Sequence, residues 1–396
     1  MNIGNYILKT YCRFCKNPVT KWFDFPGLYP LAGGFLTNED FKDEKVFPLG
    51  LSYCKLCYIF QCDQVINDDV LFKNGYYYYS SMIPFLVTHF TEYATFIKDT
   101  YYDPINKKTI LEMGCNDGVL LRKLKDNGFN VIGVDPSHTV KQLQDDGFII
   151  YNTYFNETTA NIIRNKHGKV DILLSSNSFA HIDDMDTILR GIKNILIDDG
   201  LLIIEVHNSD NIIFNLNFDF IYHEHMTYYT KKSFSKIFEN YNMSVEKIED
   251  INVHGGSMRV FIRNNKTSNY IITNYNFENY LTNFQIKLFQ WKHDFLNIFN
   301  TLKTNNKIWG YGASGRANIL LAFLGITLDG IVDDAKSKIG SYMPVNHLSI
   351  QDPIQLYISK PEYILILSWP YSESIMKNHS SFTGKFIIPL PHMMVI

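Results

Sequence analysis

The feature that most constrains the fold is a predicted strand that runs into a glycine-containing turn and then a helix. Residues 110–118 read ILEMGCNDG, with glycines at positions 114 and 118. Glycine lets the backbone approach a ligand closely and adopt dihedral angles that other residues avoid. A second predicted strand, 131–134, ends at Asp135, whose carboxylate can accept hydrogen bonds from both ribose hydroxyls of an adenosine. This order of elements is typical of an α/β domain that binds a nucleoside.

Two details of this turn favour S-adenosylmethionine (AdoMet) over a dinucleotide. The glycines follow a G-x-x-x-G spacing, and Glu112 precedes the first of them, where it would repel a pyrophosphate. AdoMet has no phosphate and carries cationic sulfonium and ammonium groups. The alternative is a tight turn between ordinary βα units. The predicted cofactor-binding residues are Glu112, Gly114, Asn116, Gly118, Asp135 and, after a later strand, Asn177.

Two pairs of cysteines, Cys12-x-x-Cys15 and Cys54-x-x-Cys57, predict a metal site near the N-terminus. Each such turn aims two thiolates at one point, and four thiolates satisfy the tetrahedral preference of zinc. Because the protein would fill all four positions, we predict a structural zinc ion with no place for a catalytic water. The alternatives are four reduced cysteines without metal, or a zinc-ribbon nucleic-acid module, which would need basic residues that this region lacks.

The rest of the chain divides into two α/β regions. In the first, buried parallel strands are predicted at 109–113, 131–134, 172–174 and 201–206, with two late strands at 245–248 and 258–262. A long amphipathic helix is predicted over 277–304, followed by a smaller βα pattern with strands at 330–332, 363–367 and 385–390. We therefore predict three domains, at residues 1–85, 86–300 and 301–396.

Composition argues against several other classes of protein. Hydrophobic residues make up 46% of the chain and charged residues 19%, which predicts a packed core rather than disorder. The formal net charge is −3, which argues against a nucleic-acid partner. The longest apolar run, 319–328, is shorter than the ~20 residues that cross a bilayer, and the N-terminus lacks a signal-peptide pattern. We expect a soluble, cytoplasmic monomer without membrane contact.

Candidate catalytic residues are densest at Tyr222-His223-Glu224-His225. The ordinary pKa of histidine, ~6.5, suits a general base near neutral pH, and a neighbouring carboxylate can orient the imidazole. His181 follows the strand predicted at 172–174 and should lie at the carboxyl edge of the sheet, where ligands bind in such folds. A single histidine is more often structural, but this concentration near a cofactor site favours chemistry.

Together these motifs resemble the sugar-nucleotide C-methyltransferases that act on dTDP-linked 4-keto sugars. The resemblance covers essentially the whole chain. It rests on the paired cysteines, the ExGxNDG turn at 112–118, the Tyr-His-Glu-His segment, and three further stretches: Tyr76-x-Tyr78-x-Ser80-Ser81, His254–Arg259 and Gly310–Ala313. It implies a class I AdoMet methyltransferase core with a Rossmann-like α/β fold, flanked by a small N-terminal zinc-binding domain and a C-terminal Rossmann-like domain.

The resemblance also implies roles for individual residues. A dTDP- or GDP-linked keto sugar would bind in the cleft between domains, and His225 would remove the proton next to its ketone. The resulting enolate carbon would attack the AdoMet methyl group in line. The other catalytic residues would be Tyr222, Glu224, His181 and Tyr76, and the substrate-binding residues Tyr78, Ser80, Ser81, His254, Gly255, Arg259 and Arg316.

A second glycine pattern leaves alternatives open. Gly310-x-Gly312-x-x-Gly315 matches a dinucleotide fingerprint, with Asp333 where a ribose-binding acid would lie, so these residues alone predict NAD binding. The resemblance assigns the segment to the sugar nucleotide instead, with Arg316 pairing with its diphosphate. Trp369-Pro370-Tyr371 departs from the family pattern in the part of the chain that the resemblance assigns to nucleotide binding. The alternative hypotheses are a sugar O-methyltransferase and an NAD-dependent sugar-nucleotide oxidoreductase.

Overall fold

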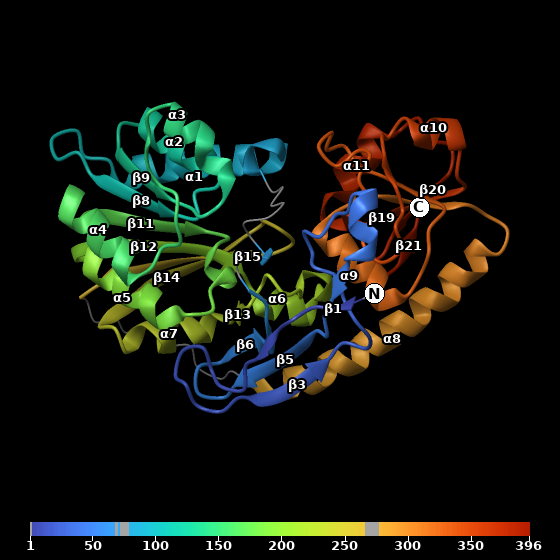
Figure 1. Ribbon diagram of the computed structural model, residues 1–396, viewed down its shortest axis with the longest axis horizontal. Helices are drawn as coiled ribbons and strands as arrows, with labels where there is room; N and C mark the ends of the chain where they lie inside the picture. The colour runs from blue at the N-terminus through green and yellow to red at the C-terminus, as the bar shows by residue number, and fades with distance from the viewer. Residues whose placement is uncertain (1, 68–69, 72–78, 266–276) are drawn as a thin grey trace.

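The computed structural model describes residues 2–67, 70–71, 79–265 and 277–396. Figure 1 shows a large α/β unit on the left, a smaller α/β unit on the right, and an N-terminal unit below and between them. The long helix α8 (Phe277–Lys303) runs from beneath the N-terminal sheet to the C-terminal unit. No helix among the described residues is long and apolar enough to cross a membrane.

The large unit contains a seven-stranded sheet with the order β10-β9-β8-β11-β12-β15-β14. All neighbouring strands are parallel except at β15, which pairs antiparallel with β12 and β14. This is the order expected for a class I AdoMet methyltransferase core, so the predicted fold class is confirmed. The strands are β8 (Thr109–Met113), β9 (Asn130–Val134), β10 (Ile149–Tyr151), β11 (Val170–Ser176), β12 (Leu196–His207), β14 (Met243–Ile251) and β15 (Ser257–Asn264).

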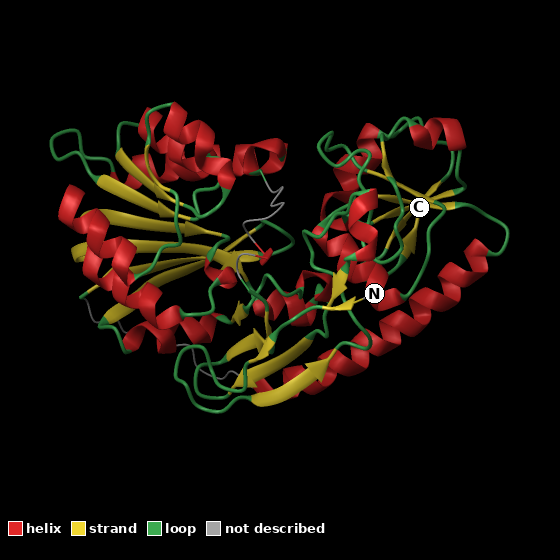
Figure 2. Ribbon diagram, in the orientation of Figure 1, coloured by secondary structure: helices red, strands yellow, loops and turns green. Residues whose placement is uncertain are grey.

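Helices cover both faces of this sheet (Figure 2). Side chains alternate along each strand, so Ile110 faces the cluster that holds α1 and α2, whereas Leu111 faces the cluster that holds α4, α5 and α7. Burial on both faces explains why these strands are continuous apolar runs. The helices are α1 (Pro84–Tyr101), α2 (Val119–Asp126), α3 (Lys141–Asp145), α4 (Glu157–His167), α5 (Met185–Ile195), α6 (Ser209–Phe214) and α7 (Lys231–Glu239).

A strand of the large unit joins the N-terminal sheet. That antiparallel sheet has the order β13-β6-β5-β3, built from β3 (Thr20–Asp24), β5 (Gly50–Cys54), β6 (Ile59–Cys62) and β13 (Thr227–Tyr229). Strand β13 begins two residues after His225, and Tyr228 pairs with Phe60. Backbone hydrogen bonds to the N-terminal unit therefore fix the end of the Tyr-His-Glu-His segment.

The C-terminal unit is a six-stranded sheet with the order β18-β17-β16-β19-β20-β21, parallel except at β21. Its strands are β16 (Ile308–Tyr311), β17 (Gly330–Val332), β18 (Ile350–Gln351), β19 (Tyr363–Ile366), β20 (Lys385–Ile388) and β21 (Met394–Val395), and its helices are α9 (Gly315–Leu324), α10 (Gln355–Ser359) and α11 (Ser372–Asn378).

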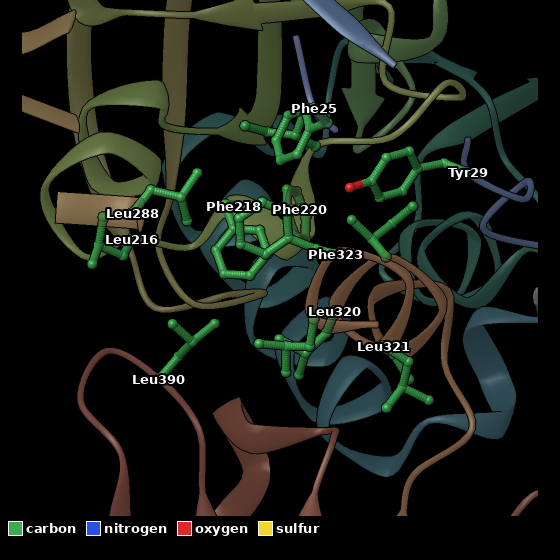
Figure 3. Close-up of a cluster of buried hydrophobic side chains, with 14 of the residues drawn as sticks. Phe25, Tyr29, Leu216, Phe218, Phe220, Leu288, Leu320, Leu321, Phe323 and Leu390 are labelled. Atoms are coloured by element: carbon green, nitrogen blue, oxygen red, sulfur yellow. The ribbon is translucent and has the colours of Figure 1, made fainter. Parts of the chain in front are cut away.

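One hydrophobic cluster joins all three units (Figure 3). Phe25 and Tyr29 come from the N-terminal unit, Phe218 from the large unit, and Phe323 from α9 of the C-terminal unit. The Phe218 ring lies 4.7 Å from Phe323, and the Phe25 ring lies 5.8 Å from it. The units are therefore held against one another by a shared core, which fixes the walls of the site between them.

Candidate functional site

The paired cysteines lie in two turns of the same shape. The residue after each pair, Lys16 or Tyr58, is left-handed, with φ of 59° and 57°. In each turn its N–H donates to the carbonyl of the first cysteine, at 3.1 Å for Cys12 and 2.9 Å for Cys54. In the second turn, the N–H of Cys57 also donates to the Cys54 sulfur at 3.4 Å.

The four sulfur atoms converge in a way that fits one zinc ion. They all lie within 4.8 Å of one another, and Cys15 Sγ and Cys54 Sγ are 3.6 Å apart. A tetrahedral site with Zn–S bonds of ~2.3 Å would separate its sulfurs by roughly 3.8 Å. With four thiolates, the ion has no open position, and none of the cysteines lines the cavity described below. The zinc ion would thus be structural.

The predicted cofactor turn lies at the carboxyl ends of β8 and β9. Gly114 has φ +75°, and a Cβ built there would lie 2.5 Å from the Ser178 Cβ. The N–H of Asn116 donates to Asp135 Oδ2 at 2.9 Å, and the N–H of Ser137 donates to Asp135 Oδ1 at 2.8 Å. These bonds hold the Asp135 carboxylate at the edge of the sheet, where it could bind a ribose.

Glu112 lies within the same edge and is almost fully buried. Its Oε2 has no hydrogen-bond partner among the described residues, and burial, with Asp135 nearby, raises its pKa well above the ordinary value. A buried, unpaired carboxyl oxygen is unfavourable unless a donor or cation satisfies it. The ammonium or sulfonium of AdoMet supplies such a cation, so the residues present fit this cofactor.

Ser80 and Ser81 dock on the cofactor turn. The N–H of Ser80 donates to Asn116 Oδ1 at 3.0 Å, and the N–H of Ser81 donates to Asp117 Oδ2 at 3.1 Å. The predicted sugar-binding residues Tyr76 and Tyr78 lie outside the described residues, and their roles stay predictions.

A cavity of about 840 Å³ opens between the three units. The N-terminal unit contributes the segment 30–37, the large unit contributes the cofactor turn and the Tyr-His-Glu-His segment, and the C-terminal unit contributes the start of α9. The predicted residues that line it are Ser80, Gly114, Asn116, Asp135, Asn177, His181, Tyr222, Glu224, His225, His254 and Arg316. The predicted residues that do not are Glu112, Gly118, Ser81, Gly255 and Arg259.

His225 is held in one tautomer. Its Nδ1 lies 3.0 Å from the Phe220 carbonyl oxygen, which can only accept, so Nδ1 carries the hydrogen. The lone pair on Nε2 then accepts from the Tyr222 hydroxyl at 3.0 Å. Burial, reinforced by His207 and His181, lowers the His225 pKa well below the ordinary value. The imidazole is thus neutral at pH 7 and can accept a proton at Nε2.

Three family models match consecutive parts of the chain. They describe a proposed zinc binding domain (residues 12–72), a methyltransferase domain (88–248) and a C-methyltransferase C-terminal domain (252–391). The C-methyltransferase NovU of Streptomyces niveus is 28% identical over 414 aligned positions, which cover 97% of this chain and 96% of NovU. The chain is an AdoMet-dependent C-methyltransferase. The enzyme class and the two cofactors predicted above, AdoMet and zinc, are thereby confirmed.

Other similar proteins match a smaller part of this C-methyltransferase chain. The ubiquinone biosynthesis O-methyltransferase of Bartonella tribocorum is 28% identical over 111 residues, or 26% of this chain and 43% of the relative. The magnesium protoporphyrin IX methyltransferase of Synechocystis, solved with bound SAM, is 12% identical and covers 45% of this chain and 79% of its own, with a TM-score of 0.34. The 1,6-didemethyltoxoflavin-N1-methyltransferase of Burkholderia thailandensis is 15% identical, with the same coverage and TM-score.

Two further histidines surround the His225 ring in the enzyme. The rings of His181 and His207 lie 4.9 Å and 4.8 Å from it. His181 Nδ1 donates to the Glu224 carbonyl at 2.6 Å. His207 was not predicted, although it is the last residue of β12, at the sheet edge where ligands bind; its Nε2 is buried without a partner among the described residues.

Glu224 lines the cavity beside a backbone turn of the N-terminal unit. Its Oε1 accepts the N–H of Gly33 at 3.1 Å, whereas Oε2 is buried without a hydrogen bond to any described residue. Burial raises the Glu224 pKa above the ordinary value. His223 points away from the cavity, with Nε2 donating to the Pro48 carbonyl at 3.0 Å. His223 and His225 thus differ, because only His225 lines the cavity.

Arg259 lies in the sheet rather than in the cavity. Its Nε donates to Glu205 Oε1 at 2.7 Å, and its guanidinium lies 3.9 Å from the centre of the Tyr93 ring. Glu205 also accepts from His89 at 2.9 Å. The charge of Arg259 is already paired within the sheet, between β15 and β12.

The second glycine pattern is packed against the N-terminal unit. A Cβ at Gly315 would lie 2.9 Å from the Ala32 Cβ, and Asn318 Nδ2 donates to the Ala32 carbonyl at 2.9 Å. Lys338 Nζ lies over the turn, 2.7 Å from the Ala313 carbonyl and 3.4 Å from Asp333 Oδ2. The space that a dinucleotide would need beside the third glycine is therefore taken by the enzyme's own chain, which disfavours the NAD alternative.

Proposed function

We propose that the enzyme methylates a carbon next to the ketone of a nucleotide-linked sugar, with His225 as the base. The observation that carries the proposal is the fixed tautomer of His225, which leaves Nε2 as the acceptor in a residue that lines the same cavity as the cofactor turn. A base can remove the proton next to a ketone because the charge passes to the ketone oxygen. Such a positioned base typically raises the rate by ~10²–10⁴.

The neighbours of His225 support this role. The Tyr222 hydroxyl donates to Nε2 at 3.0 Å; when it turns to donate to the ketone oxygen, it frees the Nε2 lone pair to take the substrate proton and stabilises the enolate that forms. His181 and Glu224 line the same cavity and supply further polar groups around a sugar. Bound AdoMet supplies an electrophilic methyl group, and the cavity of about 840 Å³ is large enough for a cofactor and a sugar nucleotide together.

The test is a panel of dTDP- and GDP-linked 4-keto-6-deoxy sugars, each paired with its 4-hydroxy counterpart, incubated with AdoMet and analysed by mass spectrometry and NMR. We expect one keto sugar to gain a methyl group bonded to carbon, and its 4-hydroxy counterpart to gain none. Methylation of the 4-hydroxy sugar on oxygen would contradict the enolate mechanism. Loss of methylation in His225→Asn, with an unchanged circular dichroism spectrum, would link the reaction to this base.

A further inference from the structure

An ion pair between two units anchors the turn that immediately precedes the Tyr-His-Glu-His segment. Arg316, the second residue of α9, donates from Nε and Nη2 to the two oxygens of Asp219, at 3.0 Å and 2.7 Å. Asp219 belongs to the 3-10 turn Phe218–Phe220 of the large unit and is fully buried. The indole Nε1 of Trp369 donates to the same carboxylate at 2.8 Å. The C-terminal unit thus binds this turn through a bidentate ion pair and through a hydrogen bond from an indole.

The same residues form a chain of ring contacts that ends at the proposed base. The Arg316 guanidinium lies 4.8 Å from the centre of the Trp369 ring and 4.9 Å from that of Phe220. The Phe220 ring lies 4.7 Å from the His225 ring, which stacks on Tyr222 at 4.0 Å. The Phe218–Phe220 turn therefore contacts His225 in two ways, through the Phe220 ring and through the Phe220 carbonyl, which accepts a hydrogen bond from Nδ1.

We propose that Arg316 and Asp219 act as positioning residues for His225, so that the catalytic base is aligned only when the C-terminal unit is docked. Without the ion pair, the Phe218–Phe220 turn loses its bidentate anchor, and the Phe220 carbonyl no longer fixes the tautomer and ring plane of His225. The carbonyl that accepts from one ring nitrogen decides which nitrogen holds the lone pair. A shift of the Phe220 carbonyl therefore changes the protonation and the position of His225 Nε2.

This role differs from the diphosphate contact predicted for Arg316. The arginine charge is already matched by a fully buried carboxylate, and Nη1 donates to the His254 carbonyl at 3.1 Å. A diphosphate at this point would meet a neutral pair instead of a free cation. Asp219 does not line the cavity, so substitutions at Asp219 separate the two roles cleanly.

The kinetic test rests on the proposed function and uses the full-length enzyme with AdoMet and dTDP-4-keto-6-deoxyglucose, or the keto sugar that the panel identifies. In Asp219→Asn and Arg316→Lys, we expect kcat to fall about 10- to 100-fold with little change in KM, because a small misplacement of a catalytic group has effects of this size. The double variant should lose no more than the worse single variant. A raised KM in Arg316→Lys, with normal kcat in Asp219→Asn, would favour the diphosphate contact and overturn the proposal.

A second readout needs no turnover. In protein labelled with ¹⁵N-histidine, two-bond ¹H–¹⁵N spectra distinguish the tautomers, and His225→Asn assigns the signal. We expect the Nδ1–H form for His225 in the wild type and a mixture of tautomers in Asp219→Asn and Arg316→Lys. An unchanged His225 signal in both variants would refute the positioning role, whether or not any sugar is methylated.

Two variants guard against a trivial loss of structure. Trp369→Phe removes only the indole hydrogen bond to Asp219 and keeps an aromatic ring against Arg316, so it should fold and show a smaller change of the same kind. Arg263→Gln removes a partly exposed ion pair with Glu246 on the large sheet. Among the described residues, this pair has no hydrogen bond or ion pair with Arg316, Asp219 or His225, so the variant should leave kcat and the His225 signal unchanged. If Asp219→Asn and Arg316→Lys fold and leave both readouts at wild-type values, the ion pair does not act through this turn.

Discussion

Replacing Gly114 with alanine tests whether the cofactor turn has the shape described above. The backbone there has φ +75°, and a left-handed residue with a Cβ is destabilised by about 1–2 kcal/mol. The new Cβ would also lie 2.5 Å from the Ser178 Cβ and 2.7 Å from its Oγ. Ser178 cannot move freely, because its hydroxyl donates to the Met113 carbonyl at 2.9 Å and lies 2.8 Å from Ser175 Oγ.

The expected size of the effect follows from these contacts. Displacing Ser178 sacrifices its two hydrogen bonds, each worth about 1 kcal/mol, so Gly114→Ala should lower the free energy of unfolding by about 3–4 kcal/mol in total. Gly147 is a matched control, since its φ is +76° and nothing lies within 4 Å of the added Cβ. Gly147→Ala should therefore lose only about 1–2 kcal/mol, from backbone strain alone.

Urea unfolding of the apoprotein measures both variants, and calorimetric titration measures their affinity for AdoMet. We expect Gly114→Ala to be less stable than Gly147→Ala and to bind AdoMet weakly, whereas Gly147→Ala binds it normally. Ser178→Gly removes the same two hydrogen bonds, so adding it to Gly114→Ala should cost little further stability. Equal losses in the two alanine variants, with normal AdoMet binding by Gly114→Ala, would refute the packing described for this turn.

Further predictions concern the metal site, the loss of folding stability at acid pH, and the ribose site. Reconstitution with Co²⁺ should give one ion per chain with the absorption of a tetrahedral four-thiolate site, and Cys54→Ser should abolish that spectrum; an octahedral spectrum would exclude the four-cysteine site. Burial lowers the pKa of His207 to about 3 and those of His223 and His254 to about 4, so these groups are neutral when folded, whereas the unfolded chain protonates them below pH ~6.5. Stability should be full above pH 6.5 and fall towards pH 4 by about 1.4 kcal/mol per histidine and pH unit, and urea unfolding curves that do not change between pH 7 and pH 5 would contradict this. Asp135→Asn should weaken AdoMet binding about 10-fold or more, measured by calorimetry, because a charged acceptor for the ribose hydroxyls is lost.

Several strands of the two mainly parallel sheets could be predicted from the sequence. Thr109–Met113 and Gly330–Val332 begin and end where the apolar runs do, because strands buried on both faces have no polar positions to interrupt the run. Ile149–Tyr151 was missed, since it is a three-residue edge strand in which Ile149 is 44% exposed. A short run without a buried face carries little signal.

The site could be predicted only in part. The cofactor turn and the cysteine pairs are local patterns, so their spacing alone identified them. The setting of His225 depends on contacts that are remote in sequence: β13 pairs with β6 of the N-terminal unit, and Asp219 pairs with Arg316 of the C-terminal unit. A lone arginine after a glycine pattern indicates an anion site, and no sequence pattern revealed that a buried carboxylate already occupies it.

Proton exchange in D₂O tests the central claim most directly. The enzyme is incubated without AdoMet, or with S-adenosylhomocysteine, and with a 4-keto-6-deoxy sugar nucleotide, and the loss of the proton next to the ketone is followed by NMR. His223 provides the matched control, because it is the neighbouring buried histidine but is bonded to Pro48 outside the cavity. We predict that the wild type and His223→Gln exchange this proton faster than buffer does, whereas His225→Asn does not. Exchange by His225→Asn at the wild-type rate would show that another group removes the proton.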